Sequence, residues 1–558
     1  PCEELSDKTA LHFFAARGQS DIIEHLLKQS NVDVNFKDQF NGTALHDALK
    51  AQRWNTAKIL IENNADVQSY VDPDNHLTPL HWLCFLPPYV RKNTTKETMD
   101  DPSPQGELID SEINSIFNLL LAKGADAKAV DLNGAIPLHL CSMRGRAKEL
   151  KTLLESENEF DLNEKVAGNA PIHLSAQLAA PRRLAAQSIE LLIKHGANVN
   201  LKNDDGSTAL HLAAFRSVPS NIEALLNGGA DVHALDTENV EPLGQAVAPL
   251  RDTHGEYAAD VVELLLKKGS NVEQRDKRGR TPLLRSIRGV ANDAFALLLA
   301  HGVNSTVTDY AHRGVLHVMA AENYASGIDA MFELHAVDVH QQDSAGHTAL
   351  HYAAAIGETN AAKTLIKHGA DVHATNIFGQ TALCVALLRK NFNVALALVE
   401  AGSDVERYCD KRERNALITL VAGADEKDEA DAVEIFELMS EHADDNDKDE
   451  FDELFNFPAN VKRGDFLGNT YEQLRMLPIL KLLLNKTSNL YQTDVDQQTV
   501  LHHVAEQTLH RVMYTILEFE SKQEKNENDI KLIDIVDKNG NTAKQLVPKG
   551  KHGYPRLA

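Results

Sequence analysis

The sequence predicts an all-α solenoid in which each repeat consists of two short helices, joined by a turn and followed by a hairpin finger. Three observations support this fold class. A four-residue phrase recurs along the chain at a nearly constant interval, and the residues between its copies follow one pattern. The chain has 558 residues, which exceeds the size at which a single hydrophobic core normally stops growing.

The phrase has the form Thr-Ala/Pro-Leu-His, and its copies are spaced by 33 to 35 residues where nothing is inserted. Complete or altered copies begin at Thr9, Thr43, Thr78, Ile136, Ala170, Thr208, Glu241, Thr281, Gly314, Thr348, Thr381, Asn415, Thr470, Thr499 and Thr542. Thr or Pro at the start of a helix and Leu facing a shared core suit the first helix of a repeat.

The segment between two copies of the phrase predicts the rest of the repeat. Small residues such as Ala353 continue the first helix, and an apolar stripe that includes Leu365 and Ile366 indicates a second helix. A Gly-Ala-Asp-Val string then leads to Asn376, two variable residues and Gly379, which is typical of a tight hairpin.

About fourteen such units in register resemble the ankyrin repeat, and the resemblance covers nearly the whole chain. It implies one ankyrin-repeat array over residues 1–558 with a curved, elongated superhelical shape. It also implies that the histidine of the phrase forms hydrogen bonds between neighbouring repeats. Each repeat buries its apolar face only by stacking on its neighbours.

Three segments depart from the regular spacing. Residues 87–106 are rich in Pro, Thr, Asp and Lys, and we expect a loop insertion there in the third repeat. Residues 425–453 contain fifteen acidic residues against two Lys, so they form an acidic insertion. Residues 454–558 are expected to form irregular C-terminal repeats and a cap.

Three interpretations of the acidic insertion stay open. It is a solvated loop, a docking site for a basic partner, or a calcium site. Asp445, Asp447 and Asp449 have the alternate spacing of an EF-hand loop, but Glu450 replaces its turn glycine and Asn456 its bidentate glutamate. The first two interpretations are therefore favoured over calcium.

Composition and charge exclude several functions. With 81 acidic and 56 basic side chains the net charge is -25, which disfavours nucleic acid as a partner. No apolar run approaches the roughly 20 residues needed to span a bilayer, so no membrane insertion is expected. Five scattered cysteines favour a reducing compartment, the cytoplasm or nucleus, and Cys84, Cys141 and Cys384 are expected to be buried thiols.

The sequence contains no pattern that predicts catalysis, a cofactor or a metal site. Nine phrases end in histidine, but residues one repeat apart lie about 8 to 10 Å from each other, whereas the ligands of one zinc ion lie about 2 Å from it. No nucleophile elbow, Walker loop or dinucleotide-binding fingerprint is present. We therefore expect a non-catalytic protein without a cofactor or bound metal.

Two groups of positions are candidates for binding a protein or peptide. In the ankyrin fold the residue after the phrase histidine faces the concave groove, and here it includes Trp82, Leu212 and Tyr352. Large apolar residues also occur at the finger tips, where polar residues are usual, and these are Phe40, Tyr310, Ile377, Phe378 and Phe466. The alternatives are that groove residues are shielded by their neighbours and that tip residues pack on the adjacent finger.

The leading hypothesis is a scaffold or adaptor that binds protein partners through its groove and fingers. A second is an ankyrin segment of a larger channel, toxin or effector whose activity lies outside these residues, and the chain begins with Pro1 rather than Met. A third is a homo-oligomer that forms through the irregular C-terminal repeats. Fold alone does not distinguish these functions.

Overall fold

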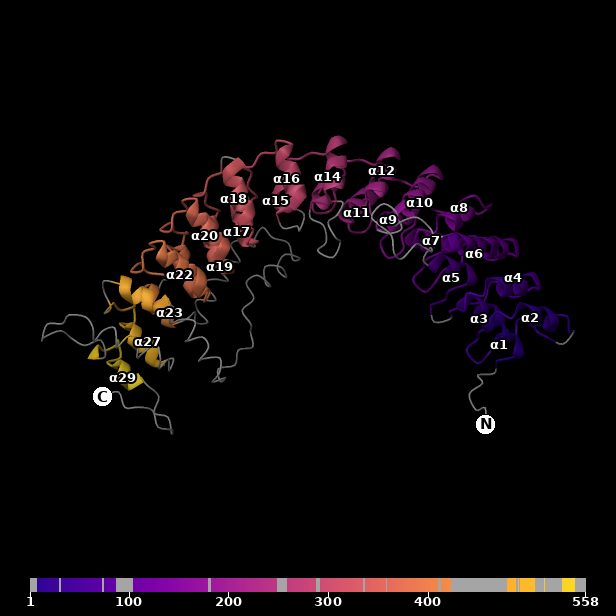
Figure 1. Cartoon of the computed structure of the whole chain (residues 1–558), viewed down its shortest axis with the longest axis horizontal. Helices are drawn as coiled ribbons and strands as arrows, with labels where there is room; N and C mark the ends of the chain where they lie inside the picture. The colour runs from indigo at the N-terminus through magenta and orange to yellow at the C-terminus, as the bar shows by residue number, and fades with distance from the viewer. Residues whose placement is uncertain are drawn as a thin grey trace. The chain divides into compact units, whose positions relative to one another are not determined.

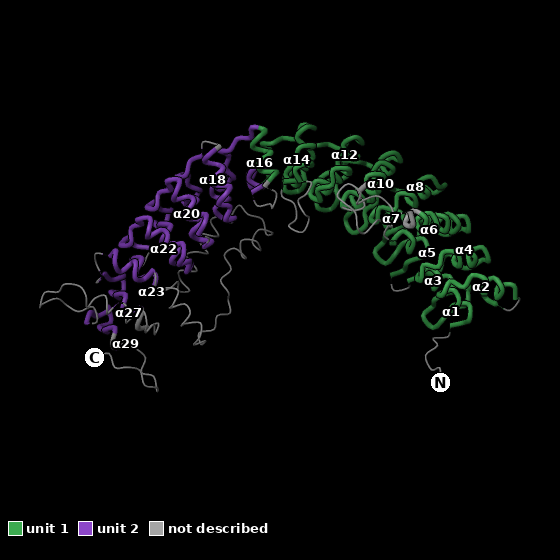
Figure 2. Tube along the Cα trace, in the orientation of Figure 1, with its two compact units in different colours: residues 1–277, 289–301 green, residues 278–288, 302–558 purple. Residues whose placement is uncertain are grey.

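The computed structural model of the chain resolves two compact units, which are described separately (Figure 2). One comprises residues 1–277 and 289–301, and the other residues 278–288 and 302–558. Within them the structure describes residues 8–29, 32–72, 75–86, 104–178, 182–247, 258–287, 292–334, 337–357, 359–409, 413–422, 479–487, 490, 492–506, 516 and 534–546.

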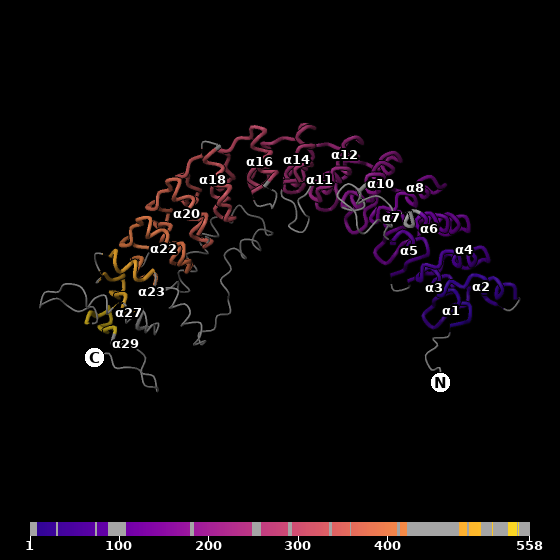
Figure 3. The backbone as a smooth tube through the Cα atoms, in the orientation of Figure 1, coloured from indigo at the N-terminus to yellow at the C-terminus, as the bar shows by residue number. Residues whose placement is uncertain are grey.

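The first unit consists of helix pairs stacked in two layers (Figures 1 and 3). The first helices of its repeats contact one another in series, and they are α1 (Ala10–Arg17), α3 (Ala44–Lys50), α5 (Pro79–Phe85), α7 (Pro137–Arg144), α9 (Pro171–Ala176), α11 (Ala209–Phe215) and α13 (Pro242–Ala246). The second helices form the other layer, and they are α2 (Ser20–Leu27), α4 (Trp54–Glu62), α6 (Pro104–Ala122), α8 (Ala147–Leu154), α10 (Arg182–Lys194), α12 (Pro219–Asn227), α14 (Ala258–Lys267) and α16 (Asn292–Ala300).

The second unit repeats this arrangement. Its first helices are α15 (Pro282–Ser286), α17 (Val315–Ala321), α19 (Ala349–Ile356), α21 (Ala382–Leu388), α23 (Ala416–Ala422), α27 (Val500–Glu506) and α29 (Ala543–Leu546). Its second helices include α18 (Ala325–Leu334), α20 (Thr359–Lys367) and α22 (Phe392–Glu400). In the described part of the chain, β-structure is limited to isolated bridges, several of which close a finger. The predicted all-α repeat with paired helices and fingers is confirmed.

The segments that interrupt the repeats fall mostly outside the described residues. Helix α6 begins at Pro104, so the last three residues of the loop expected at 87–106 are helical, which is a correction at that boundary. The acidic insertion at 425–453 and much of 454–558 lie outside the described residues. No helix in the described ranges is both long enough and apolar enough to cross a membrane.

The phrase histidines join each repeat to the next, as predicted. All nine are at most 2% exposed. In each, Nε2 lies 2.9 to 3.2 Å from a backbone oxygen at the finger of the following repeat. In eight of them, Nδ1 accepts the backbone N–H of the residue that begins the phrase, at 3.0 to 3.3 Å.

This geometry requires a neutral imidazole. Nδ1 accepts a hydrogen bond, so the ring proton is on Nε2. The Nε2–H group then donates a hydrogen bond to the next repeat. Burial lowers the pKa of His46 and of His351 to about 4. Burial also lowers the pKa of His81, His139, His173, His211 and His317. The link between repeats is therefore intact at neutral pH.

The cysteines follow the prediction only in part. Cys84 and Cys141 are buried free thiols, as expected. The expectation for Cys384 is wrong, because it forms a disulfide with Cys409. Cys384 ends a phrase in the place of histidine, and that place faces the next finger, which Cys409 begins.

We predict that His351→Ala lowers the urea midpoint of the chain and the free energy of unfolding by about 2 kcal/mol, because it leaves two buried backbone groups without their partner. These groups are the Thr348 N–H and the Gln380 carbonyl, each 3.1 Å from the ring. The matched control is His373→Ala, at an exposed histidine between α20 and α21. Equal midpoints for the two variants, measured by far-UV circular dichroism, would contradict this account.

Candidate functional site

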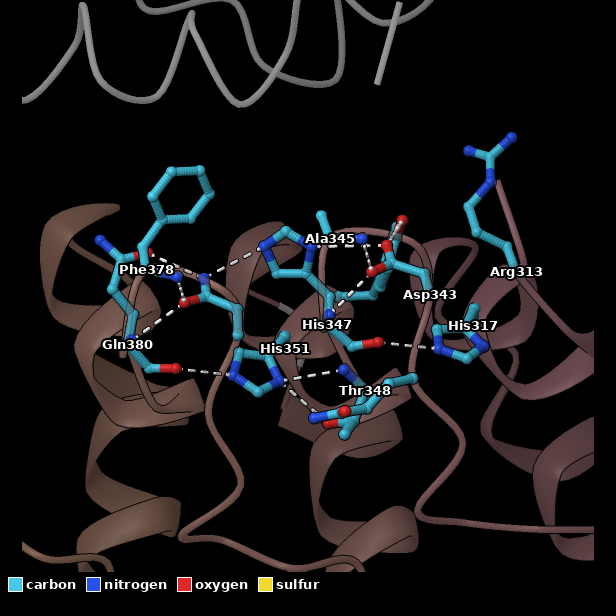
Figure 4. Close-up of polar contacts among 12 residues, drawn as sticks. Arg313, His317, Asp343, Ala345, His347, Thr348, His351, Phe378 and Gln380 are labelled. Atoms are coloured by element: carbon cyan, nitrogen blue, oxygen red, sulfur yellow. Dashed lines mark hydrogen bonds and ion pairs between the residues drawn. The ribbon is translucent and has the colours of Figure 1, made fainter. Parts of the chain in front are cut away.

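Three consecutive fingers of the second unit form the candidate site (Figure 4). They comprise residues 309–313, 343–347 and 376–380. Each finger begins with Asp or Asn, whose side-chain oxygen accepts backbone N–H groups from within the same finger. In the middle finger, Asp343 Oδ1 accepts from Ala345 at 2.9 Å and from His347 at 2.8 Å. The hairpin is therefore fixed by its own first residue.

A chain of side-chain hydrogen bonds connects the middle finger to the next one (Figure 4). The Tyr352 hydroxyl donates to Asp343 Oδ2 at 2.9 Å, and His347 Nδ1 lies 3.4 Å from the same oxygen. The Asn376 amide, from the next finger, lies 3.2 Å from His347 Nε2 and 3.0 Å from Gln380 Oε1. The bases of two fingers thus form one polar network.

The negative charge of Asp343, at the centre of this network, is stabilised by the hydrogen-bond donors His347 and Tyr352. Burial by itself raises the pKa of Asp343, but hydrogen bonds from His347 and Tyr352 outweigh it and hold that pKa below its ordinary value. Burial, with the neighbouring Asp343 charge, raises the pKa of Tyr352 well above its ordinary value. At neutral pH the Tyr352 phenol therefore keeps its proton. It donates a hydrogen bond to the Asp343 carboxylate, and a hydrogen bond to a charged acceptor is a strong one.

Backbone hydrogen bonds also join the fingers to one another. Ser344 N–H donates to the Ala311 carbonyl at 2.9 Å, and Ile377 N–H donates to the Ala345 carbonyl at 3.0 Å. Gly346 has a φ of 75°, and a Cβ there would lie 3.0 Å from the Ile377 nitrogen, so glycine permits this close approach. The three fingers are consequently a preorganised surface rather than three independent hairpins.

Large apolar side chains lie on this surface. The exposed fraction of Tyr310 is 56% and that of Ile377 is 62%, and Phe378 is half-buried. Figure 4 shows the Phe378 ring extending from its finger away from His351 and Thr348. We call Tyr310, Ile377 and Phe378 the finger-tip surface.

The charged groups of the fingers are already paired. Arg313 Nε donates to Asp309 Oδ2 at 2.7 Å, and its backbone N–H donates to Asp309 Oδ1 at 2.8 Å. Its charge therefore does not make the surface an anion site. Within the described residues, no three His, Cys, Asp or Glu side chains are grouped closely enough to hold a metal ion. The surface is best suited to apolar contact.

The structure separates the predicted binding residues into different environments. Tyr352 is only 8% exposed and holds Asp343, so its prediction as an exposed groove anchor is wrong. In the first unit Trp82 and Leu212 are half-buried, and the Trp82 Nε1 is buried with no partner among the described residues. Phe40, in a first-unit finger, is 68% exposed. Phe466 lies outside the described residues.

The pairing of groove residues with finger carboxylates was missed in the sequence. In three repeats a polar groove residue follows the first residue of its finger, an Asp, by nine positions. Its side chain forms a hydrogen bond with Oδ2 of that Asp. Gln245 donates to Asp236 at 2.8 Å, and His503 Nε2 lies 3.0 Å from Asp494, as Tyr352 pairs with Asp343. This constant offset of nine residues is a signal that the sequence contains.

We predict that Tyr352→Phe lowers the free energy of unfolding by about 2 kcal/mol, because a buried carboxylate loses a hydrogen bond. Tyr310→Phe is the matched control, since Tyr310 is 56% exposed, and it should leave stability unchanged. Urea unfolding of the two variants checks the difference. A Tyr352→Phe variant as stable as wild type would show that this hydroxyl contributes nothing to the finger.

Comparison with known proteins agrees with the repeat architecture. Models described as ankyrin repeats match residues 2–71 and 316–409 (three copies) and residues 176–226 (many copies).

Among curated relatives, the human transient receptor potential cation channel subfamily A member 1 is 21% identical over 66% of this chain and 37% of its own length. The E3 ubiquitin-protein ligase KEG of Arabidopsis thaliana is 26% identical over 48% of this chain and 17% of its own length. The mouse B-cell lymphoma 3 protein homolog is 28% identical over 36% of this chain and 43% of its own length. The chain thus spans less than half the length of each of these relatives. Its repeated phrase, its paired helices and the family matches together identify it as an ankyrin-repeat protein.

Proposed function

We propose that the chain is a non-catalytic protein-interaction module that binds a protein or peptide partner on the finger-tip surface of its second unit. Ankyrin repeats are generally protein–protein interaction modules. The observation that carries the finer proposal is the exposure of Tyr310 and Ile377 beside Phe378 on fingers that are hydrogen-bonded to one another. Apolar residues at a tip add nothing to the core, so their role is in contact with another molecule.

The rigidity of these fingers favours binding energetically. A partner that docks on preorganised loops does not have to order them, so more of the interaction energy appears as affinity. Aromatic side chains are enriched among the residues that dominate such interfaces. Burial of one large apolar side chain contributes about 1.5 to 3 kcal/mol, so the three tip residues supply the core of a small interface.

The partner is proposed to be a protein in the cytoplasm or nucleus. The net charge of -25 and the apolar character of the tips both disfavour nucleic acid. Docking of a basic partner at residues 425–453, and self-association through the C-terminal repeats, remain proposals about segments that lie largely outside the described residues.

A second candidate function is that of an interaction segment within a larger protein. The match to the transient receptor potential cation channel covers 66% of this chain but 37% of that channel, and the ligase match covers 17% of the ligase. The chain thus resembles part of longer proteins. In that case the activity of the whole protein lies in parts other than these residues.

We predict that a variant with all three tip residues changed to Ser loses at least tenfold in the capture of a specific partner from native extract, measured by quantitative mass spectrometry. The changes are Tyr310→Ser, Ile377→Ser and Phe378→Ser. They remove exposed apolar area without altering the network below it, so the urea midpoint should stay close to that of wild type.

The matched control changes three exposed apolar residues of the first unit, Leu108, Val130 and Leu132, which are 62%, 55% and 62% exposed, to Ser. A partner retained by this control and lost from the tip variant supports the proposal. Equal capture by both variants contradicts it. Absence of any specific partner on wild type favours the segment of a larger protein.

A further inference from the structure

The repeat that begins at Thr381 replaces the phrase histidine with Cys384. The sulfur occupies the place of the histidine ring at the start of α21. The Thr381 hydroxyl donates to Cys384 Sγ at 3.3 Å, as the Thr348 hydroxyl lies 2.9 Å from Nδ1 of His351. This repeat therefore lacks the imidazole that reaches the next finger in nine other repeats.

The next finger is altered at the matching position. Cys409 begins it, where the neighbouring fingers have Asp343 and Asn376. Its backbone N–H donates to the Arg414 carbonyl at 2.6 Å, in the way that the Asp343 N–H donates to the His347 carbonyl at 2.9 Å. At this junction the place of the phrase histidine and the first position of the next finger are thus both cysteine.

These two cysteines are joined. The disulfide closes a 25-residue separation, and the two Cα atoms lie 4.9 Å apart, within the range that a disulfide spans. It connects the first helix of one repeat to the finger of the next. The hydrogen bond from His351 to the Gln380 carbonyl makes the same connection one repeat earlier. A covalent bond therefore takes the place of a hydrogen bond in an equivalent position.

Proximity alone does not account for the pair. Cys84 and Cys141 also face each other in first helices of successive repeats, and they are free thiols. Burial, with a hydrogen bond to Cys84, raises the pKa of the Cys141 thiol, which keeps it protonated and unreactive. The described residues thus contain one pair of free thiols and one disulfide.

We propose that Cys384 and Cys409 form a redox modification site that locks α21 to the finger of the α23 repeat. The reactant is a small disulfide of the oxidised glutathione class. Each protein thiol gives up its proton, the protein disulfide forms, the bond between the two sulfurs of the small disulfide breaks, and two small thiols are released. An excess of the reduced small thiol reverses the exchange.

The consequence is a change in the coupling between repeats. In repeat proteins stability is the sum of repeat terms and nearest-neighbour terms, so a lost junction affects mainly the repeats beside it. The disulfide also restricts the unfolded chain by closing a loop. Cys384 and Cys409 are each 1% exposed, so thiol–disulfide exchange requires local opening of the finger. The reduced form keeps its packed helices but opens α23 more often.

The experiment equilibrates the full chain at glutathione ratios from fully oxidised to a hundredfold excess of the reduced form. Mass spectrometry without reduction measures the peptide that links Cys384 to Cys409, and Cys84 with Cys141 serves as the internal thiol control. Hydrogen exchange of the amides in α23 (Ala416–Ala422) is then compared with that in α19 (Ala349–Ile356).

We expect the linked peptide to decrease as reduced glutathione increases, and exchange in α23 to rise at least tenfold while α19 is unchanged. Cys384→Ser should exchange like the reduced wild type at every ratio. The double variant Cys384→His with Cys409→Asp restores the residues of the other junctions and should exchange slowly at every ratio.

A linked peptide that is absent at all ratios would overturn the proposal. So would one that persists in the hundredfold excess of reduced glutathione, because that result describes a permanent crosslink. Exchange in α23 that is independent of the glutathione ratio in wild type would also overturn it, and this measurement does not depend on the folding of either variant.

Discussion

A neutral imidazole buried between two repeats is the interaction on which the other features depend. It accepts a hydrogen bond at the start of its own helix and donates one to the finger of the next repeat, as His351 does with Thr348 and Gln380 at 3.1 Å each. Only the neutral Nε2–H ring can do both. Burial maintains that state, and stacking of repeats provides the burial, so packing and hydrogen bonding support each other.

Repeats without the histidine show which property the junction needs. Glu241 accepts the Asn271 N–H at 3.1 Å, and the Asn415 amide donates to Gln492 at 2.7 Å, so in each case a side chain from the phrase still reaches the segment that leads into the following finger. Cys384 makes the connection covalently. The chemistry of the link therefore varies from one of these junctions to another. Because the fingers are linked in this way, apolar side chains at their tips stay exposed instead of folding back onto the fingers.

The sequence predicts the helices, the fingers and the role of the histidines, because these depend on local propensity and a fixed interval. It does not predict the environment of Tyr352, because that residue's exposure depends on Asp343, nine residues earlier, rather than on its own position in the helix. The exposure of Tyr310 and Ile377 follows from their place at finger tips, although the Tyr310 ring also lies close to Gly279 of the preceding finger. Cysteine spacing along the chain does not predict the Cys384–Cys409 bond, because the two residues meet only across a junction between repeats.

The central claim is that the phrase histidines are neutral Nε2–H links. Nitrogen-15 spectra of histidine-labelled protein, recorded between pH 7 and pH 4, test it directly, with resonances assigned by His46→Gln and His351→Gln. Both rings should show the Nε2–H pattern at pH 6 and titrate near 4. Titration of these two rings near 6.5, the ordinary value for histidine, would contradict the account.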